Sequence, residues 1–243
     1  AAHLRWGRDL RTIRGLIVPL LIAGVPMLLI LRQPDLGTSL TFVPVVLLML
    51  FAAGAKKRHL AVVVTFGLIA AVILGAFFLK PYQQDRLTAF LDPEAHFRTD
   101  GYHLIQSKTA IGAGGLAGVG WQEGTQNRLG YLPENHTDFI FAVLGEEFGL
   151  LGAGFVLILY GTLVVQIFWI AHQAREPFGR LYCVGVGTLI LFQVVVNVGM
   201  TVGLLPITGL TLPLMSYGGS SLIATLIALG GVANVQIRRP VTI

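Results

Sequence analysis

The chain has 243 residues, of which 54% are hydrophobic and only 12% are charged, and its mean hydropathy is +0.75. A soluble domain carries about a quarter charged residues, so this composition excludes an ordinary water-soluble protein and indicates that lipid is the solvent. The net charge of +5 does not indicate nucleic-acid binding, because the basic residues are dispersed over short loops.

Six apolar segments predict membrane-spanning helices. They cover residues 13–31, 36–55, 60–79, 138–171, 181–205 and 214–237. Most reach the roughly 20 residues that a helix needs to cross the hydrocarbon, and backbone polar groups cannot face lipid unpaired. The fourth segment is too long for one perpendicular span, so we expect it to tilt or to project beyond the membrane. The predicted fold is an all-α polytopic membrane helix bundle that forms a single domain over residues 1–243.

The basic residues gather on one side of these six segments. The ones that precede the first segment or follow the second, fourth and sixth are Arg5, Arg8, Arg11, Arg14, Lys56, Lys57, Arg58, Arg175, Arg180, Arg238 and Arg239. The short loops on the other side hold only Arg32. The positive-inside rule therefore puts both ends of the chain in the cytoplasm and the long polar segment 80–137 outside, as an extracytoplasmic loop between the third and fourth spans.

Two isolated residues in or near the spans have simple interpretations. Asp35 follows a proline at the start of the second span, where its carboxylate either caps that helix or pairs with a buried lysine. The single cysteine, Cys183, lies inside an apolar run, and we interpret it as a packed thiol.

The long polar segment contains a glycine-rich stretch, residues 101–118. It is not a dinucleotide-binding fingerprint, because no strand precedes it and its third glycine is out of place. One interpretation is a re-entrant or interfacial segment that packs closely and exposes backbone N–H groups, which with Lys108 would hold an anionic headgroup. The other is a flexible loop without a ligand.

Residues 132–141, at the end of the polar segment, place a carboxylate and an imidazole where water meets the bilayer. Asp138 is expected to open the fourth helix, with Thr137 as its N-cap. The carboxylate either complements the helix dipole or acts as a general base with His136 as its partner. A helix N-terminus lowers the pKa of a carboxylate while burial in an apolar cleft raises it, and the sequence does not decide between them.

Polar residues also occur inside the predicted spans. Glu146 and Glu147 fall at membrane depth in the fourth span, where we interpret them as structural residues that cap a kink or pair with a lysine. Gln193 and Asn197 share one face of the fifth span and either bond between helices or line a cavity.

The connection between the last two spans, residues 205–221, combines apolar side chains with prolines, glycines and hydroxyl groups. Its apolarity predicts that it dips back toward the membrane, and its prolines and glycines interrupt helix. Hydroxyls such as those of Ser216 and Ser220 would then line a cavity, because irregular backbone at membrane depth is tolerated where it is buried in protein or lines a cavity.

Together these motifs resemble those of the SEDS family (shape, elongation, division, sporulation) of bacterial cell-wall polymerases. Segments 33–39, 101–118, 132–141 and 213–221 look like four of its signatures in order, over essentially the whole chain. Segments 102–108 and 120–126 are more similar to the RodA branch, which acts in elongation, than to FtsW. The family has ten spans and this chain is similar to the last six. The resemblance therefore implies that further N-terminal spans complete the lining of the cavity. It also implies that these residues alone are not fully active.

The resemblance implies a peptidoglycan glycosyltransferase of the bacterial cytoplasmic membrane, which transfers the growing glycan from its lipid diphosphate carrier to a sugar hydroxyl of lipid II. Asp138 matches the essential acidic residue of the family and is expected to be catalytic, as the base that takes the hydroxyl proton. The residues expected to bind substrate are Gln106, Lys108, His136, Ser216 and Ser220, and those expected to be structural are Asp35, Glu146, Glu147 and Asn197.

The resemblance also implies partners. A class B penicillin-binding protein, a transpeptidase, would cross-link the product, and lipid II and polyprenyl diphosphate would occupy the site. No metal ligand is assigned, although either Lys108 or a divalent cation, Mg²⁺ or Mn²⁺, would stabilise the leaving diphosphate.

Two other classes of function remain open. A lipid II flippase would need a polar cavity and a gate toward lipid, but not one irreplaceable carboxylate. A non-enzymatic scaffold for cell-wall synthases would need neither and would tolerate the loss of Asp138.

Overall fold

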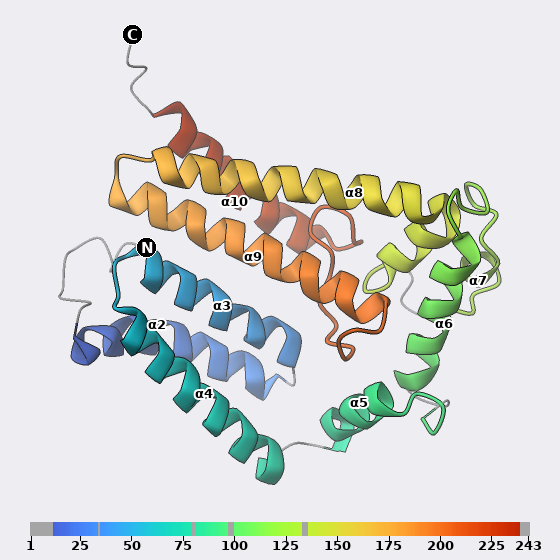
Figure 1. The fold of residues 1–243 in the computed structure, drawn as a ribbon, viewed down its shortest axis with the longest axis horizontal. Helices are drawn as coiled ribbons and strands as arrows, with labels where there is room; N and C mark the ends of the chain where they lie inside the picture. The colour runs from blue at the N-terminus through green and yellow to red at the C-terminus, as the bar shows by residue number, and fades with distance from the viewer. Residues whose placement is uncertain (1–11, 34, 79–80, 97–99, 133–135, 239–243) are drawn as a thin grey trace. The chain divides into compact units, whose positions relative to one another are not determined.

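The computed structural model describes residues 12–33, 35–78, 81–96, 100–132 and 136–238. All regular structure in these residues is helical (Figure 1). The helices are α2 (Ile13–Arg32), α3 (Leu36–Ala52), α4 (Lys57–Phe78), α5 (Pro81–Leu91), α6 (Asp100–Gly114), α7 (Thr125–Arg128), α8 (Ile140–Gln173), α9 (Pro177–Thr201) and α10 (Gly219–Ile237). The prediction of an all-α fold is confirmed. Of the predicted basic clusters, Arg5, Arg8, Arg11 and Arg239 lie outside the described residues.

Several of these helices are long and apolar enough to cross a membrane. In the described part of the chain they are Gly15–Arg32, Ile140–Gln173, Pro177–Thr201 and Gly219–Ile237, and Leu36–Ala52 is a shorter apolar helix. Large apolar side chains such as Leu28, Val72 and Ile158 are 64%, 71% and 67% exposed, as a surface in contact with lipid requires. The protein is therefore a multi-pass membrane helix bundle. The side on which residues 80–137 lie stays a prediction.

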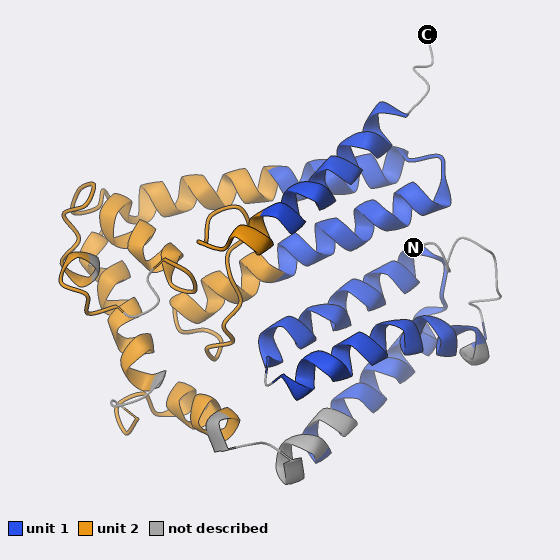
Figure 2. Ribbon diagram, turned by 180° about the vertical axis from the view of Figure 1, so that it is seen from behind, with its two compact units in different colours: residues 1–78, 163–192, 223–243 blue, residues 79–162, 193–222 orange. Residues whose placement is uncertain are grey.

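The described helices form two compact units, shown in two colours in Figure 2. Unit 1 comprises residues 1–78, 163–192 and 223–243, and unit 2 comprises residues 79–162 and 193–222. The segment between α4 and α8, predicted as a loop, contains the three helices α5, α6 and α7 and belongs almost entirely to unit 2.

In unit 1, α2 packs against α3 through an apolar contact. Leu16, Leu50 and Ala55 are buried there. Asp35 is the N-cap of α3, and its Oδ1 accepts a hydrogen bond of 2.9 Å from the Thr38 N–H. Of the two interpretations of Asp35, the structure therefore shows the one in which its carboxylate caps the helix.

The long fourth apolar segment is divided by a break at Gly149, close to the kink that one interpretation of Glu146 and Glu147 allowed. Gly149 has φ 64° and ψ −163°, a backbone conformation that is essentially restricted to glycine. The part after the break, residues 150–173, is about 36 Å long at ~1.5 Å per residue, enough to cross the hydrocarbon. The segment thus consists of two helices that meet at a glycine, and its predicted tilt or projection beyond the membrane stays a prediction.

The backbone groups released by this break are bonded to the turn after α6. The Val119 and Gly120 N–H groups donate to the carbonyls of Glu146 and Glu147 at 3.0 and 3.1 Å. In return, the N–H groups of residues 150 and 151 donate to the carbonyls of residues 115 and 116 at 2.9 and 3.1 Å. Unpaired backbone groups at membrane depth cost several kcal/mol each (order of magnitude), so the glycine-rich turn allows the break to exist.

Candidate functional site

Asp138 lies in a turn that immediately precedes α8. The helix begins at Ile140, two residues later than predicted, and residues 136–139 form the turn. Asp138 is half-buried. A Cβ built on Gly209 would lie 3.6 Å from Asp138 Oδ2, so the carboxylate faces the connection between α9 and α10.

Asn197 holds this turn and that connection together. It is fully buried on α9, and its Nδ2 donates to the carbonyls of Asp138 and Leu210 at 2.9 and 2.7 Å. Within the described residues its Oδ1 has no hydrogen-bond partner. Of the two interpretations of Asn197, the structure shows the bond between elements. The side chain fixes the backbone of Asp138 through its carbonyl group.

Ser216 joins the connection to the residues before Asp138. Its Oγ donates to the Thr137 carbonyl at 2.6 Å and accepts from the Leu212 N–H at 2.8 Å. The Tyr217 N–H donates to the His136 carbonyl at 2.8 Å. The Ser216 hydroxyl proton is donated to backbone, so this residue joins the two segments in the structure, and its predicted contact with substrate stays a prediction. Ser220 lies exposed in the first turn of α10, and the structure describes no hydrogen bond that joins it to this group.

An open cavity adjoins this turn. Its volume is about 480 Å³, and it is lined by His136, Ile140, Met215 and Tyr217. His136 is exposed and Tyr217 is 80% exposed. Asp138 is not one of the lining residues, although it lies between two of them in the chain. The volume falls in the range of about 300–1,000 Å³ that is usual for ligand sites.

Helix α6 carries Lys108 and Gln106 and is fixed to the end of α9. Ser107, fully buried, donates from its Oγ to the Thr201 carbonyl at 2.8 Å. Lys108 is exposed, and its side chain crosses Gly203, where an added Cβ would lie 1.9 Å from Lys108 Cε. This places a cation just beyond the C-terminus of α9, which is electrostatically favourable. Gln106 is half-buried on the same helix.

His103, which the sequence analysis did not select, also connects α6 to the Asp138 turn. Its ring is stacked on that of Phe139, with centroids 6.1 Å apart and planes at 10°. Phe139 is 2% exposed, and the His103 Nδ1 has no hydrogen-bond partner in the part of the chain that is described. The two residues are far apart in sequence and share no periodic pattern, so only the fold brings them together.

Of the two glutamates of α8, Glu146 contacts the segment between α6 and α8. Glu146 is fully buried and its Oε1 accepts from the Gln126 N–H at 2.9 Å and from Thr125 Oγ1 at 3.4 Å. It therefore fixes the start of α7. Glu147 is 8% exposed. A Cβ on Gly124 would lie 2.6 Å from Glu146 Oε2, so only glycine fits beside the carboxylate.

The glycine-rich stretch 101–118 packs closely, as one of its two interpretations predicted, while its role in holding an anionic headgroup stays a prediction. Most of the stretch is helix α6. Added Cβ atoms on Gly114 and Gly118 would lie 1.9 and 2.1 Å from the carbonyl oxygens of Gly145 and Glu147. The Gly118 N–H donates to Gly114 at 2.8 Å. Gly114 and Gly118 allow close packing against α8, and the N–H groups of Gly115, Gly118, Val119 and Gly120 are bonded to backbone carbonyls.

A divalent cation finds no ligand cluster in the described residues. There, no group of three or more His, Cys, Asp or Glu side chains could hold a metal ion. The divalent cation stays an untested expectation, and no step below depends on one.

Comparison with known proteins identifies relatives over nearly the whole chain. The model of a family described as cell cycle protein, FtsW/RodA/SpoVE, matches residues 7–240. The peptidoglycan glycosyltransferase MrdB of Escherichia coli strain K12 is 45% identical over 222 residues, which are 91% of this chain and 60% of MrdB. The chain thus spans about three fifths of the length of this relative.

Solved structures agree with this comparison. A chain of a peptidoglycan synthase complex, solved to explain the coordination of polymerization and crosslinking, is 34% identical with a TM-score of 0.80, over 98% of this chain and 66% of that one. The rod shape determining protein RodA of Thermus thermophilus is 32% identical with a TM-score of 0.63, over 98% of this chain and 61% of that one.

Proposed function

The chain belongs to the FtsW/RodA/SpoVE family of cell cycle proteins, and on this premise we propose that the protein is a peptidoglycan glycosyltransferase that polymerises lipid II. The observation that carries the proposal is the Asp138 turn, whose backbone is held by Asn197 while its carboxylate faces the connection between α9 and α10. The similarity to MrdB supports the same activity.

In the proposed reaction Asp138 is the general base. A sugar 4-hydroxyl of the acceptor attacks the anomeric carbon of the donor with inversion, and Asp138 takes the hydroxyl proton. The new glycosidic C–O bond forms as the bond to the lipid diphosphate breaks, and the diphosphate leaves with the electron pair. Because a base must be held within hydrogen-bond reach of the proton, the fixed backbone of Asp138 supports this role.

The leaving diphosphate requires positive charge, and Lys108 is the cation that we propose for it. Its exposed ammonium lies on α6, in the same unit as Asp138, and its side chain is held over Gly203. A cation placed in advance stabilises charge that develops in the transition state. His136 and Tyr217, which line the adjacent cavity, are the proposed contacts of a sugar ring, and Gln106 and Ser220 remain candidates for substrate binding.

We further propose that the protein lies in the bacterial cytoplasmic membrane, with the basic clusters in the cytoplasm and residues 80–137 outside. A site on the outer face suits a substrate with a polyprenyl tail in the bilayer. The likeness to a chain from a peptidoglycan synthase complex supports a class B penicillin-binding protein as the partner.

Lipid II polymerisation by the purified full-length protein tests the proposal. Asp138→Asn keeps the shape of the side chain but cannot take a proton, and the loss of a positioned base lowers rates by about a hundredfold to ten-thousandfold. We expect Asp138→Asn to fold, to bind its partner and to make almost no glycan, as measured by gel electrophoresis of labelled product.

Asp85→Asn, the same substitution at an exposed position on α5, is the matched control and should polymerise normally. Substantial glycan synthesis by a well-folded Asp138→Asn protein would refute the mechanism. A flippase would instead move lipid II across vesicles without making polymer, and a scaffold would bind its partner and do neither.

A further inference from the structure

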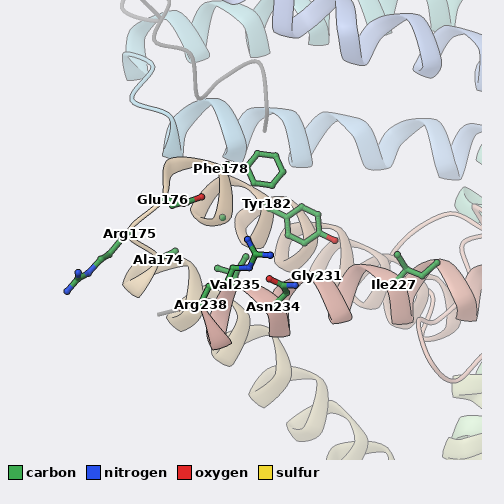
Figure 3. Close-up of a pocket in the computed structure, with 11 residues that line it drawn as sticks. Ala174, Arg175, Glu176, Phe178, Tyr182, Ile227, Gly231, Asn234, Val235 and Arg238 are labelled. Atoms are coloured by element: carbon green, nitrogen blue, oxygen red, sulfur yellow. The ribbon is translucent and has the colours of Figure 1, made fainter. Parts of the chain in front are cut away.

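At one end of unit 1, helices α9 and α10 and the turn between α8 and α9 line a cavity that the proposed polymerase site does not use. Its volume is about 470 Å³, and it lies among the turn between α8 and α9, the first turns of α9 and the last turns of α10 (Figure 3). All its lining residues belong to unit 1. Because α8, α9 and α10 are candidate spans that begin or end there, the cavity lies at a membrane boundary.

The lining of this cavity is polar at one end and apolar at the other. Arg238 and Asn234 lie at the end of α10, whereas Ile227 lies three turns earlier on the same helix. The separation of Arg238 and Ile227 is about 16 Å at ~1.5 Å per residue. Ile227 is 68% exposed, so the apolar end opens onto the lipid-facing surface. This gradient matches a headgroup joined to an acyl chain better than it matches a soluble anion.

An aromatic pair forms a fixed wall of the cavity. Phe178 and Tyr182 are stacked on α9, with ring centroids 6.2 Å apart, and the Tyr182 hydroxyl donates to the Ala228 carbonyl at 3.2 Å. A Cβ on Gly231 would lie 2.4 Å from that hydroxyl oxygen, so the close approach of α10 depends on glycine. Amphipathic aromatic side chains of this kind are enriched where a membrane meets water.

The charge at the polar end is not neutralised by the lining. Figure 3 shows the Arg238 side chain extending over the cavity, while that of Arg175 points away from it. Glu176 is the acidic residue of the lining, and among the described residues no ion pair joins it to Arg238. Basic pockets between spans at a membrane boundary are suited to phospholipid phosphate groups.

We propose that this cavity binds an anionic phospholipid such as phosphatidylglycerol. The phosphate pairs with Arg238, the glycerol backbone lies along the Phe178–Tyr182 wall, and an acyl chain passes Ile227 along α10. In the orientation predicted from the basic clusters, this lipid comes from the cytoplasmic leaflet.

Native mass spectrometry of the full-length protein tests this site. The protein is titrated with phosphatidylglycerol and with phosphatidylethanolamine that carries the same acyl chains, and the amounts of each retained are compared. Because one arginine near a membrane surface contributes about 1 kcal/mol, Arg238→Gln should lower the preference for phosphatidylglycerol by about fivefold. Asn234→Trp, at an exposed position on α10, fills the space between the polar and apolar ends and should lower retention without removing a charge.

Arg32→Gln is the matched control, since Arg32 is an exposed arginine in the last turn of α2 and does not line the cavity. It should leave the preference unchanged. Equal retention of phosphatidylglycerol by the wild type and Arg238→Gln, or equal binding of the two lipids by the wild type, would overturn the proposal. Displacement of phosphatidylglycerol by inorganic phosphate would also overturn it, because the occupant would then be a soluble phosphate compound.

Discussion

Side-chain hydrogen bonds serve different purposes in the two units. In unit 1 they are mostly local, as where Asp35 caps α3 and Thr188 bonds the Val184 carbonyl one turn earlier. In unit 2 local bonds also occur, but several side-chain hydrogen bonds join residues far apart in sequence, as from Ser107 to Thr201 and from Asn197 to Asp138.

The difference follows from the path of the backbone. Unit 1 consists mainly of uninterrupted helices, whose backbone groups bond within each helix. Unit 2 contains the break at Gly149, the turn at Asp138 and the connection between α9 and α10, where backbone groups lack helical partners. Buried polar side chains supply those partners, because non-helical backbone at membrane depth is stable only when it is satisfied inside the protein. The candidate site lies where the helices are interrupted, and its parts should be more sensitive to substitution than those of unit 1.

The largest effect is expected at the break in α8. Gly149→Ala adds a Cβ 2.4 Å from the Gly118 nitrogen and forces a positive φ on a residue with a side chain. Clash and strain together should cost at least about 3 kcal/mol and prevent normal folding. Thermal unfolding in detergent, followed by circular dichroism, measures the change.

Gly154→Ala, on the same helix α8, is the control for this substitution. A Cβ added at Gly154 meets nothing within 4 Å. It should be neutral or slightly stabilising, since alanine favours helix by up to about 1 kcal/mol over glycine. Equal stability of Gly149→Ala and Gly154→Ala would show that the break is not required.

Asn197→Ala should have the next largest effect. The substitution removes the amide that donates hydrogen bonds to two backbone carbonyls. We therefore expect a loss of about 1–3 kcal/mol in stability together with a large loss of polymerisation. Thr188→Ala, at another buried polar position but in unit 1, removes only a bond within one helix and should cost less than about 1 kcal/mol. If both substitutions cost the same, the contrast between the units fails.

Lys108→Ala should change activity rather than stability. The side chain is exposed, so folding should be little affected, while loss of the proposed diphosphate contact should lower the polymerisation rate by about a hundredfold. Steady-state rates on lipid II measure this, and Lys108→Arg should retain part of the activity. Arg128→Gln, which removes another exposed cation of unit 2, is the control. Wild-type polymerisation rates in Lys108→Ala would contradict the proposed diphosphate contact. Lys108 would then act only as a cation beyond the C-terminus of α9.

The smallest effect is expected at Asp35 in unit 1. Asp35→Ala removes an N-cap and should cost about 1 kcal/mol in stability, while Asp35→Asn should keep most of it, because asparagine also caps. Thermal unfolding of the two variants measures the difference. A loss of polymerisation in Asp35→Asn, without loss of stability, would instead favour the pairing with a lysine that the sequence left open.

The sequence alone determined the helical membrane fold and the family. Apolar segments of about 20 residues have few alternatives to helix in lipid. The local cap at Asp35 was also predictable, because it depends on residues three apart. These properties follow from composition and from neighbours in the chain.

The tertiary structure alone decided how the polar residues are used. The break at Gly149, the stacking of His103 on Phe139 and the bonds of Asn197 join segments that no sequence period relates. Gly114 and Gly118 pack against α8, and backbone groups of residues 115–120 complete the hydrogen bonds of the broken helix, a partnership that their sequence does not specify. The local sequence around a glycine or a buried amide is the same whether the residue binds a ligand or bonds another part of the fold. Only its partner in the tertiary structure distinguishes these two roles.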